Sequence, residues 1–135
     1  GTTDYAVEIF YQAIKCGKYQ CFISEDLALP MMFMDDAVNA TIQLMEAPEE
    51  NIKVRSSYNL GGISFTPEEL VDEIRKYIPD LEVTYKPDFR QEIAESWPRR
   101  ISDEAAQNDW DWRHEYDLQR MTAVMVEKIR EKLGK

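Results

Sequence analysis

The stretch SYNLGGISFTPEELVDEIRKYIPDLEVTY, residues 57–85, decides the fold class. Its first part, Ser57–Leu60, predicts a short strand that two glycines end. The string TPEE at Thr66–Glu69 then holds a threonine that can cap a helix, a proline suited to the first helical position and a glutamate that completes a capping box. The helix is expected to stop at Pro79–Asp80, and Leu81–Tyr85 alternates as a half-buried strand does. Strand, helix and strand in this order indicate an α/β fold.

The rest of the chain continues this alternation. The expected elements are a helix with Ala6, Phe10, Ala13 and Ile14 that Gly17 ends, a strand at Tyr19–Ile23, a buried strand at Met31–Met34, a helix capped by Asp35 or Asp36 and ended at Ala47-Pro48, and a final helix that Asp117 caps. The segment from Pro87 to Tyr116 is less regular. About five helices accompany only about four short strands, which are too few for a sheet covered on both faces. The set resembles the end of a larger sheet.

Composition excludes several classes of protein. The 135 residues, 15.8 kDa, suffice for one domain with a core, and 44% hydrophobic residues argue against disorder. The sequence contains no apolar run of about 18 residues, so we expect no transmembrane span. The net charge of −10 repels phosphate backbones, so nucleic acid is a poor candidate partner. The chain starts at Gly1 without a signal-peptide pattern, so either a segment was removed or this is a piece of a longer protein.

The cysteines and the histidine indicate neither a disulfide framework nor a metal site. Cys16 and Cys21 are interpreted as ordinary thiols of a reducing compartment, which favours the cytoplasm. The single histidine, His114, stands in a polar stretch and is interpreted as a surface residue. One histidine and two cysteines cannot supply the ligand spacing of a typical zinc site.

Sequence motifs for nucleotide chemistry are weak. The five glycines form neither G-x-G-x-x-G nor a P-loop, so no ordinary nucleotide site is expected in these residues. Tyr11 and Lys15 match the Y-x-x-x-K spacing, in which a lysine lowers the pKa of a catalytic tyrosine. That pattern arises easily by chance, and we interpret this pair as a coincidence.

Two other places allow a structural and a functional interpretation. Trp97, in the string ESWP, is either a core aromatic beneath a loop or a wall of a ligand pocket. Gly1, Thr2 and Thr3 either cap the first helix or offer N–H groups and hydroxyls to a carboxylate, although Asp4 places a negative charge beside them.

An ordered set of strings resembles the C-terminal part of the extended short-chain dehydrogenase/epimerase superfamily, and most closely its L-threonine 3-dehydrogenase branch. The strings are GTTDYAVEIF at 1–10, LPMM at 29–32 with DA at 36–37, SYN at 57–59, SFTPEE at 64–69, TYKPDFRQ at 84–91, AESWP at 94–98 and DWDW at 109–112. Each string is modestly specific, whereas the ordered set is strongly specific. The family usually has DWGW where this chain has Asp111, which is expected to alter a local turn.

The resemblance implies that the parent enzyme is an oxidoreductase that passes hydride from L-threonine to NAD⁺ and forms 2-amino-3-ketobutyrate. Residues 1–135 would be its substrate-binding portion, inactive alone, with about 33–62 returning to the sheet of a missing N-terminal Rossmann half. That half would carry the catalytic residues and the NAD site. Thr3 would contact a small amino-acid substrate, Trp97 would close the pocket, and Gly1 and Thr2 would shape its wall. The parent is expected to be a homo-oligomer.

Two alternatives to this interpretation stay open. A UDP-sugar epimerase or dehydratase usually has an arginine just before the strand that leads to the Asp36 position, where it pairs with the diphosphate. Residues 27–32, LALPMM, contain no basic residue, and the net charge of −10 does not favour a diphosphate either. The second alternative is a non-catalytic binding module, because these residues hold no nucleotide loop.

Overall fold

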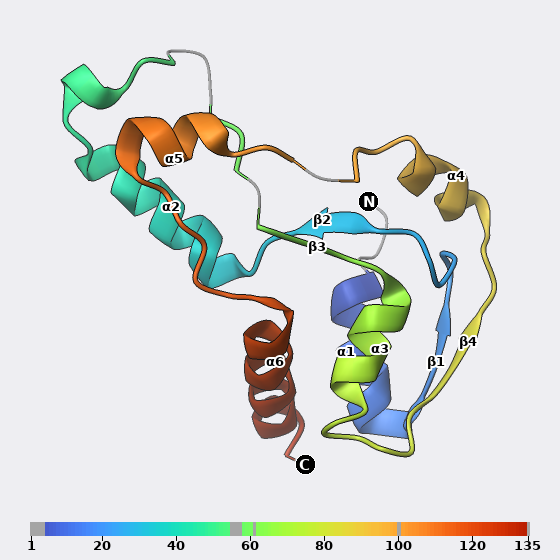
Figure 1. The fold of residues 1–135 in the computed structure, drawn as a ribbon. Coiled ribbons are helices and arrows are strands. Elements are labelled where there is room, and N and C mark those ends of the chain that lie inside the picture. Colours follow the sequence, from blue (N-terminus) through green and yellow to red (C-terminus); the bar gives the residue numbers. More distant parts are fainter. Residues whose placement is uncertain (1–4, 55–57, 61, 100, 135) are drawn as a thin grey trace.

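The computed structural model describes residues 5–54, 58–60, 62–99 and 101–134 (Figure 1). Its elements are α1 (Tyr5–Cys16), β1 (Lys18–Cys21), β2 (Leu29–Met31), α2 (Met34–Glu46), the 3₁₀ turn η1 (Glu49–Asn51), β3 (Ile63–Phe65), α3 (Pro67–Ile74), β4 (Glu82–Tyr85), α4 (Phe89–Glu95), α5 (Glu104–Trp110) and α6 (Leu118–Leu133). The predicted α/β class is confirmed, with six α-helices and few short strands among the described residues.

The strands form two separate pairs. β1 and β4 are parallel, with Lys18 opposite Glu82, whereas β2 and β3 are antiparallel, with Leu29 opposite Phe65. In Figure 1 the β2–β3 pair runs between the part that contains α2 and α5 and the part that contains α1 and α3. Two-stranded pairs of three or four residues are marginal by themselves, so the helices packed around them supply the stability.

Several helix ends form where local sequence signals predicted them. Thr66 Oγ1 accepts a hydrogen bond from Glu69 N at 3.2 Å, and Glu69 Oε1 accepts one from Thr66 N at 3.4 Å, so the capping box of α3 is complete. Asp117 caps α6 by accepting a hydrogen bond from Arg120 N at 2.8 Å. Gly17 ends α1 with φ of +69°, a conformation that glycine adopts without strain.

Other elements differ from the prediction in their bounds or in their presence. α3 ends at Ile74 rather than near Pro79, and residues 58–60 form no strand, while Ser57 lies outside the described residues. The strand of this region is β3, and Gly62 just before it lies so close to β2 that a Cβ would clash with the Met31 carbonyl oxygen. The strand expected at Met31–Met34 is instead β2, and Met34 begins α2. The segment from Pro87 to Tyr116 contains α4 and α5.

The aspartates expected to cap α2 do something else. The N-cap is Phe33, which makes no side-chain capping bond, and Asp36 lies inside the helix with 1% of its surface exposed. Its carboxylate accepts hydrogen bonds from Glu115 N at 2.9 Å and Tyr116 N at 3.1 Å. Asp36 therefore fastens α2 to the segment that precedes α6, because its buried carboxylate needs donors and finds them in these two N–H groups.

The buried side chains form two clusters. The larger one joins α1, α3 and α6 to the strands and includes Ile9, Phe65 and Ile74, all 1% exposed or less. The smaller one lies between α2 and α5, where Ala40 packs with Ala106, Trp110 and Trp112. Among the described residues, no helix is both long enough and apolar enough to span a bilayer.

Candidate functional site

Trp97 borders a cavity of about 200 Å³. The residue follows α4 and is 49% exposed, so it is not a core aromatic. Its N–H donates to the Ala94 carbonyl oxygen at 3.1 Å, which ties it to the last turn of the helix. The other lining residues come from the start of α1, the segment from β1 to β2, and α4; they are Tyr5, Phe22, Ile23, Leu29, Pro30, Met31, Arg90, Ile93 and Ala94.

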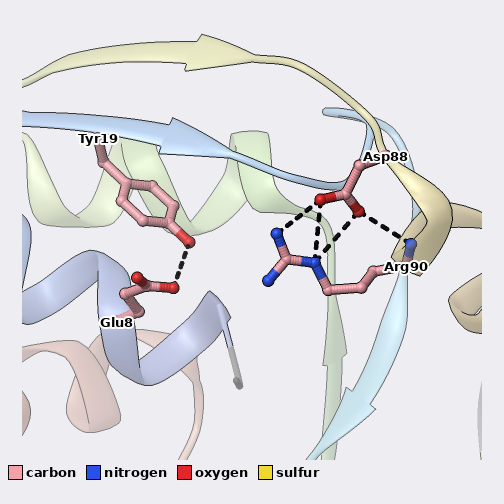
Figure 2. A network of polar contacts seen from close by, with 4 residues as sticks. All are labelled: Glu8, Tyr19, Asp88 and Arg90. Atoms are coloured by element: carbon pink, nitrogen blue, oxygen red, sulfur yellow. Dashed lines mark hydrogen bonds and ion pairs between the residues drawn. The ribbon is translucent and has the colours of Figure 1, made fainter. Parts of the chain in front are cut away.

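The cavity has one charged residue in its described lining, Arg90, and this residue is already paired (Figure 2). The Arg90 guanidinium Nη2 lies 2.6 Å from Asp88 Oδ2, and Nε lies 3.1 Å from each carboxylate oxygen. Its Cζ also lies 3.6 Å from the centroid of the Phe22 ring. Hydrogen bonds from Arg90 lower the pKa of Asp88, and the same bonds raise the pKa of Arg90. Both groups therefore stay charged over a wide pH range, and the cavity wall carries little net charge there.

Two more contacts attach α4 to the body of the protein. Ser24 N donates to Gln91 Oε1 at 2.8 Å, and Gln91 Nε2 donates to Ser24 Oγ at 3.1 Å. Asp88 caps α4 by accepting from Arg90 N at 2.9 Å, and its own N–H donates to the Phe22 carbonyl oxygen. Sequence reasoning missed Arg90 and Gln91 as site residues. The only local signal was Asp88, a residue that favours helix N-caps.

The hydroxyl and thiol groups of the β1–β4 pair are poor acid–base candidates. Tyr19 Oη donates to Glu8 Oε2 at 3.3 Å (Figure 2), and burial together with the Glu8 charge raises the pKa of this phenol. Burial raises the pKa of Tyr85 to about 12 and also raises the pKa of the Cys21 thiol. All three groups keep their protons near neutral pH, so none of them supplies a base or a thiolate nucleophile.

The Tyr11–Lys15 pair lies away from this cavity and is not part of its described lining. Tyr11 Oη accepts a hydrogen bond from Lys132 Nζ at 3.2 Å, and the Lys15 ammonium is 5.9 Å from the Tyr11 ring centroid. Tyr11 thus joins α1 to α6. The interpretation of the Y-x-x-x-K spacing as a coincidence stays a prediction.

The other predicted site residues are placed as follows. Gly1, Thr2 and Thr3 lie outside the described residues. His114 is exposed, Cys16 is exposed and Cys21 is buried, and both thiols are free. Within the described part of the chain, no group of three His, Cys, Asp or Glu side chains could hold a metal ion.

The described glycines do not fit a dinucleotide site. Gly17 and Gly134 have φ of +69° and end α1 and α6, and Gly62 packs against Met31. A dinucleotide site needs glycines in the turn between a strand and the N-terminus of a helix. No described glycine occupies such a turn, so the described residues offer no glycine-rich turn for a dinucleotide.

Asp111 keeps the turn that a glycine would make. It is the C-cap of α5, with φ of 57° and ψ of 36°, in the left-handed region. The Trp112 N–H reaches back to the Ala106 carbonyl oxygen at 3.2 Å, which places Trp112 in the smaller core. Asp111 therefore holds a backbone conformation that costs a residue with a Cβ more than it costs glycine.

Comparison with known proteins identifies the relatives of the chain. It is 48% identical over 127 residues to the protein named "L-threonine 3-dehydrogenase, mitochondrial" from Bos taurus, across 93% of this chain and 34% of the bovine protein. The crystal structure of L-threonine dehydrogenase from Phytophthora infestans superposes with a TM-score of 0.93 and 52% identity, over 98% of this chain and 43% of that chain. The chain matches the C-terminal part of an extended short-chain dehydrogenase.

Other relatives of the chain carry less specific names. An uncharacterized epimerase/dehydratase from Staphylococcus haemolyticus is 44% identical over 133 residues, 98% of this chain and 42% of that protein. No protein-family model matches the chain. The chain spans between about a third and under half of the length of these relatives, so their activities belong to proteins much longer than these 135 residues.

Proposed function

We propose that the chain is the C-terminal, substrate-binding part of an NAD-dependent L-threonine 3-dehydrogenase, which converts L-threonine to 2-amino-3-ketobutyrate. The observation that carries the proposal is the position of Trp97. It borders a cavity of about 200 Å³ in a chain about half identical to proteins with that name. The SWP string is one of the strings on which the resemblance rests, so the motif and the cavity point to the same place.

The cavity suits a small amino acid. Its described walls are mostly apolar, as in most small-molecule sites, and Trp97 can cover a bound molecule from the exposed side. Thr3 stands two residues before Tyr5, which lines the cavity, and we assign Thr3 a hydrogen bond to the substrate. Gly1 and Thr2 would shape the same wall. A small cavity without an unpaired cation in its described lining favours L-threonine over a nucleotide sugar.

In this proposal the catalytic residues and the NAD site belong to a Rossmann half that precedes these residues. The exposed side of α2 supports such a partner. Met34, Val38, Ile42 and Met45 recur on one face of the helix and are 47–80% exposed. The segment of about residues 33–62 would then pack on the Rossmann sheet. Without that half, the 135 residues would show no turnover, and we expect the parent to be a homo-oligomer.

The deciding experiment is a substrate screen on the complete product of the gene that encodes these residues. We expect NADH formation with L-threonine and NAD⁺, and none with UDP-glucose or UDP-galactose. Turnover of a nucleotide sugar without turnover of L-threonine would overturn the proposal in favour of an epimerase or dehydratase. Threonine-dependent formation of NADH by the 135 residues alone would overturn the proposal that this part is inactive by itself.

The cellular compartment is a separate proposal. We place the parent enzyme in the cytoplasm because both thiols are free, as expected of a reducing compartment. The bovine relative is named as mitochondrial. Subcellular fractionation with an antibody against these residues distinguishes the two, and recovery with a mitochondrial marker would contradict the cytoplasmic assignment.

A further inference from the structure

The side chain of Gln91 binds one distant residue at two atoms. Gln91 Oε1 accepts from Ser24 N at 2.8 Å, and Gln91 Nε2 donates to Ser24 Oγ at 3.1 Å and to Glu95 Oε1 at 2.7 Å. Ser24 lies between β1 and β2, 67 positions from Gln91. The amide therefore joins the middle of α4 to the β1–β2 segment, and a second acceptor on the same helix orients it.

Helix α4 needs such an attachment. It has seven residues, and an isolated helix of that length is not stable in water. Ala94 is its one buried residue, while Phe89 is 68% exposed and Ile93 is 42% exposed. Asp88 and Arg90 hold the start of the helix against Phe22. The Gln91 side chain attaches the middle of the helix to Ser24.

The last turn of α4 transmits this placement to Trp97. The Ser96 hydroxyl and N–H both donate to the Ile93 carbonyl oxygen, at 2.6 and 3.2 Å, and the Trp97 N–H donates to Ala94. These bonds tie the Trp97 backbone to the last turn of the helix. We therefore expect a change in how α4 packs on Ser24 to move the indole relative to the cavity.

We propose that Gln91 is a positioning residue: by binding Ser24 it sets the orientation of α4 and holds Trp97 at the mouth of the cavity. Its consequence for substrate binding rests on the function proposed above, whereas its consequence for Trp97 does not. When the arrangement in which Trp97 borders the cavity is only partly populated, the apparent affinity for a ligand falls in proportion to that population.

The test uses fluorine NMR of the 135-residue chain labelled with 5-fluorotryptophan. The three tryptophans give three resonances, and Trp97→Phe assigns one of them. We expect Gln91→Ala to shift or broaden the Trp97 resonance and to leave those of Trp110 and Trp112, in the smaller core, unchanged. Ser24→Ala keeps its backbone bond to Gln91, so its effect should be intermediate. Glu92→Ala, at an exposed neighbour on α4, is the matched control and should leave all three resonances unchanged.

An unchanged Trp97 resonance in Gln91→Ala overturns the proposal. If Gln91→Ala disturbs all three resonances, Ser24→Ala decides instead. A change in the Trp97 resonance alone supports the proposal, and an unchanged Trp97 resonance overturns it. In the complete enzyme, loss of about one hydrogen bond should raise the KM for L-threonine about fivefold and leave kcat close to that of the wild type. An unchanged KM overturns the substrate-binding consequence. A wild-type enzyme that does not oxidise L-threonine overturns the proposed function instead, and the NMR result for Gln91 stands independently.

Discussion

Single residues contribute unequally to the stability of this fold, and Asp36 is expected to contribute strongly. Its buried carboxylate is the acceptor for two backbone N–H groups from a distant segment. Asp36→Ala removes both of these charge-assisted hydrogen bonds between α2 and the segment before α6, so we expect the free energy of unfolding to fall by about 2 kcal/mol. Urea unfolding of the 135-residue chain measures it. Glu46→Ala, at an exposed site near the end of α2, is the control, and equal losses in both variants would contradict the role of Asp36.

Asp111 offers the opposite case, because its backbone favours another residue. Its φ of 57° is cheap for glycine and costly for residues with a Cβ. We expect Asp111→Gly to be about 1 kcal/mol more stable than Asp111→Ala, with the wild type between them. Thermal unfolding of the three proteins checks this order. A glycine variant less stable than the alanine variant would mean that the left-handed turn is not the source of strain.

Trp97 is the residue on which the proposed activity depends. In the complete enzyme, Trp97→Ala should lower kcat/KM for L-threonine about tenfold to a hundredfold, because the cavity loses the side chain that covers its open side. Tyr11→Phe removes a hydroxyl bonded to Lys132 and should leave the kinetics unchanged. Steady-state NADH assays compare the two. If a folded Trp97→Ala enzyme kept the wild-type kcat/KM, the indole would have no role in substrate binding.

Among the elements, α3 depends most on local sequence. Its capping box satisfies two N-terminal N–H groups, so Thr66→Ala should cost about 1 kcal/mol of unfolding free energy. Because Glu69 closes the same box, Glu69→Ala combined with Thr66→Ala should cost less than the sum of the single changes. Chemical denaturation of the four proteins gives the coupling. Strict additivity would show that the two bonds form independently.

The elements also show how far sequence reasoning reaches. α1, α3 and α6 carry caps and an apolar stripe, and these local signals predicted them. α4 and α5 have seven residues each and depend on distant partners, such as Ser24 for Gln91, that no local pattern reveals. Asp36 looked like a cap because it stands near a helix start. Its true partners, Glu115 and Tyr116, are distant in sequence, so its role could not be inferred from neighbouring residues.

The site shows the same division. Trp97 could be selected because an indole before a proline is a conspicuous feature of a loop, and it does line a cavity. Arg90 and Gln91 could not be selected, because their importance comes from Phe22 and Ser24 on another segment. Motif strings therefore reveal the residue that faces the cavity, and only the three-dimensional contacts reveal what holds it.

At the scale of the whole molecule, the exposed apolar face of α2 should govern association. Met34 is 70% and Met45 is 80% exposed, so the 135-residue chain should self-associate through this face. Replacing both with Gln, which also favours helix, should shift the chain toward monomer. Static light scattering measures the mass. Tyr77→Gln, at an exposed apolar site outside α2, is the control, and a monomeric wild type would contradict the prediction.

The bonds from Asp36 to Glu115 and Tyr116 also have a consequence for synthesis on the ribosome. The acceptor and its two donors are separated by 79 and 80 positions, and the tryptophans that pack on α2 also come late in the chain. A chain made from its N-terminus therefore exposes the inner face of α2, with Ala40 and Asp36, until residues 106–116 have emerged. Termination before residue 106 leaves this face without the tryptophans and without both donors to Asp36, so an unfinished product exposes apolar surface that the complete chain buries.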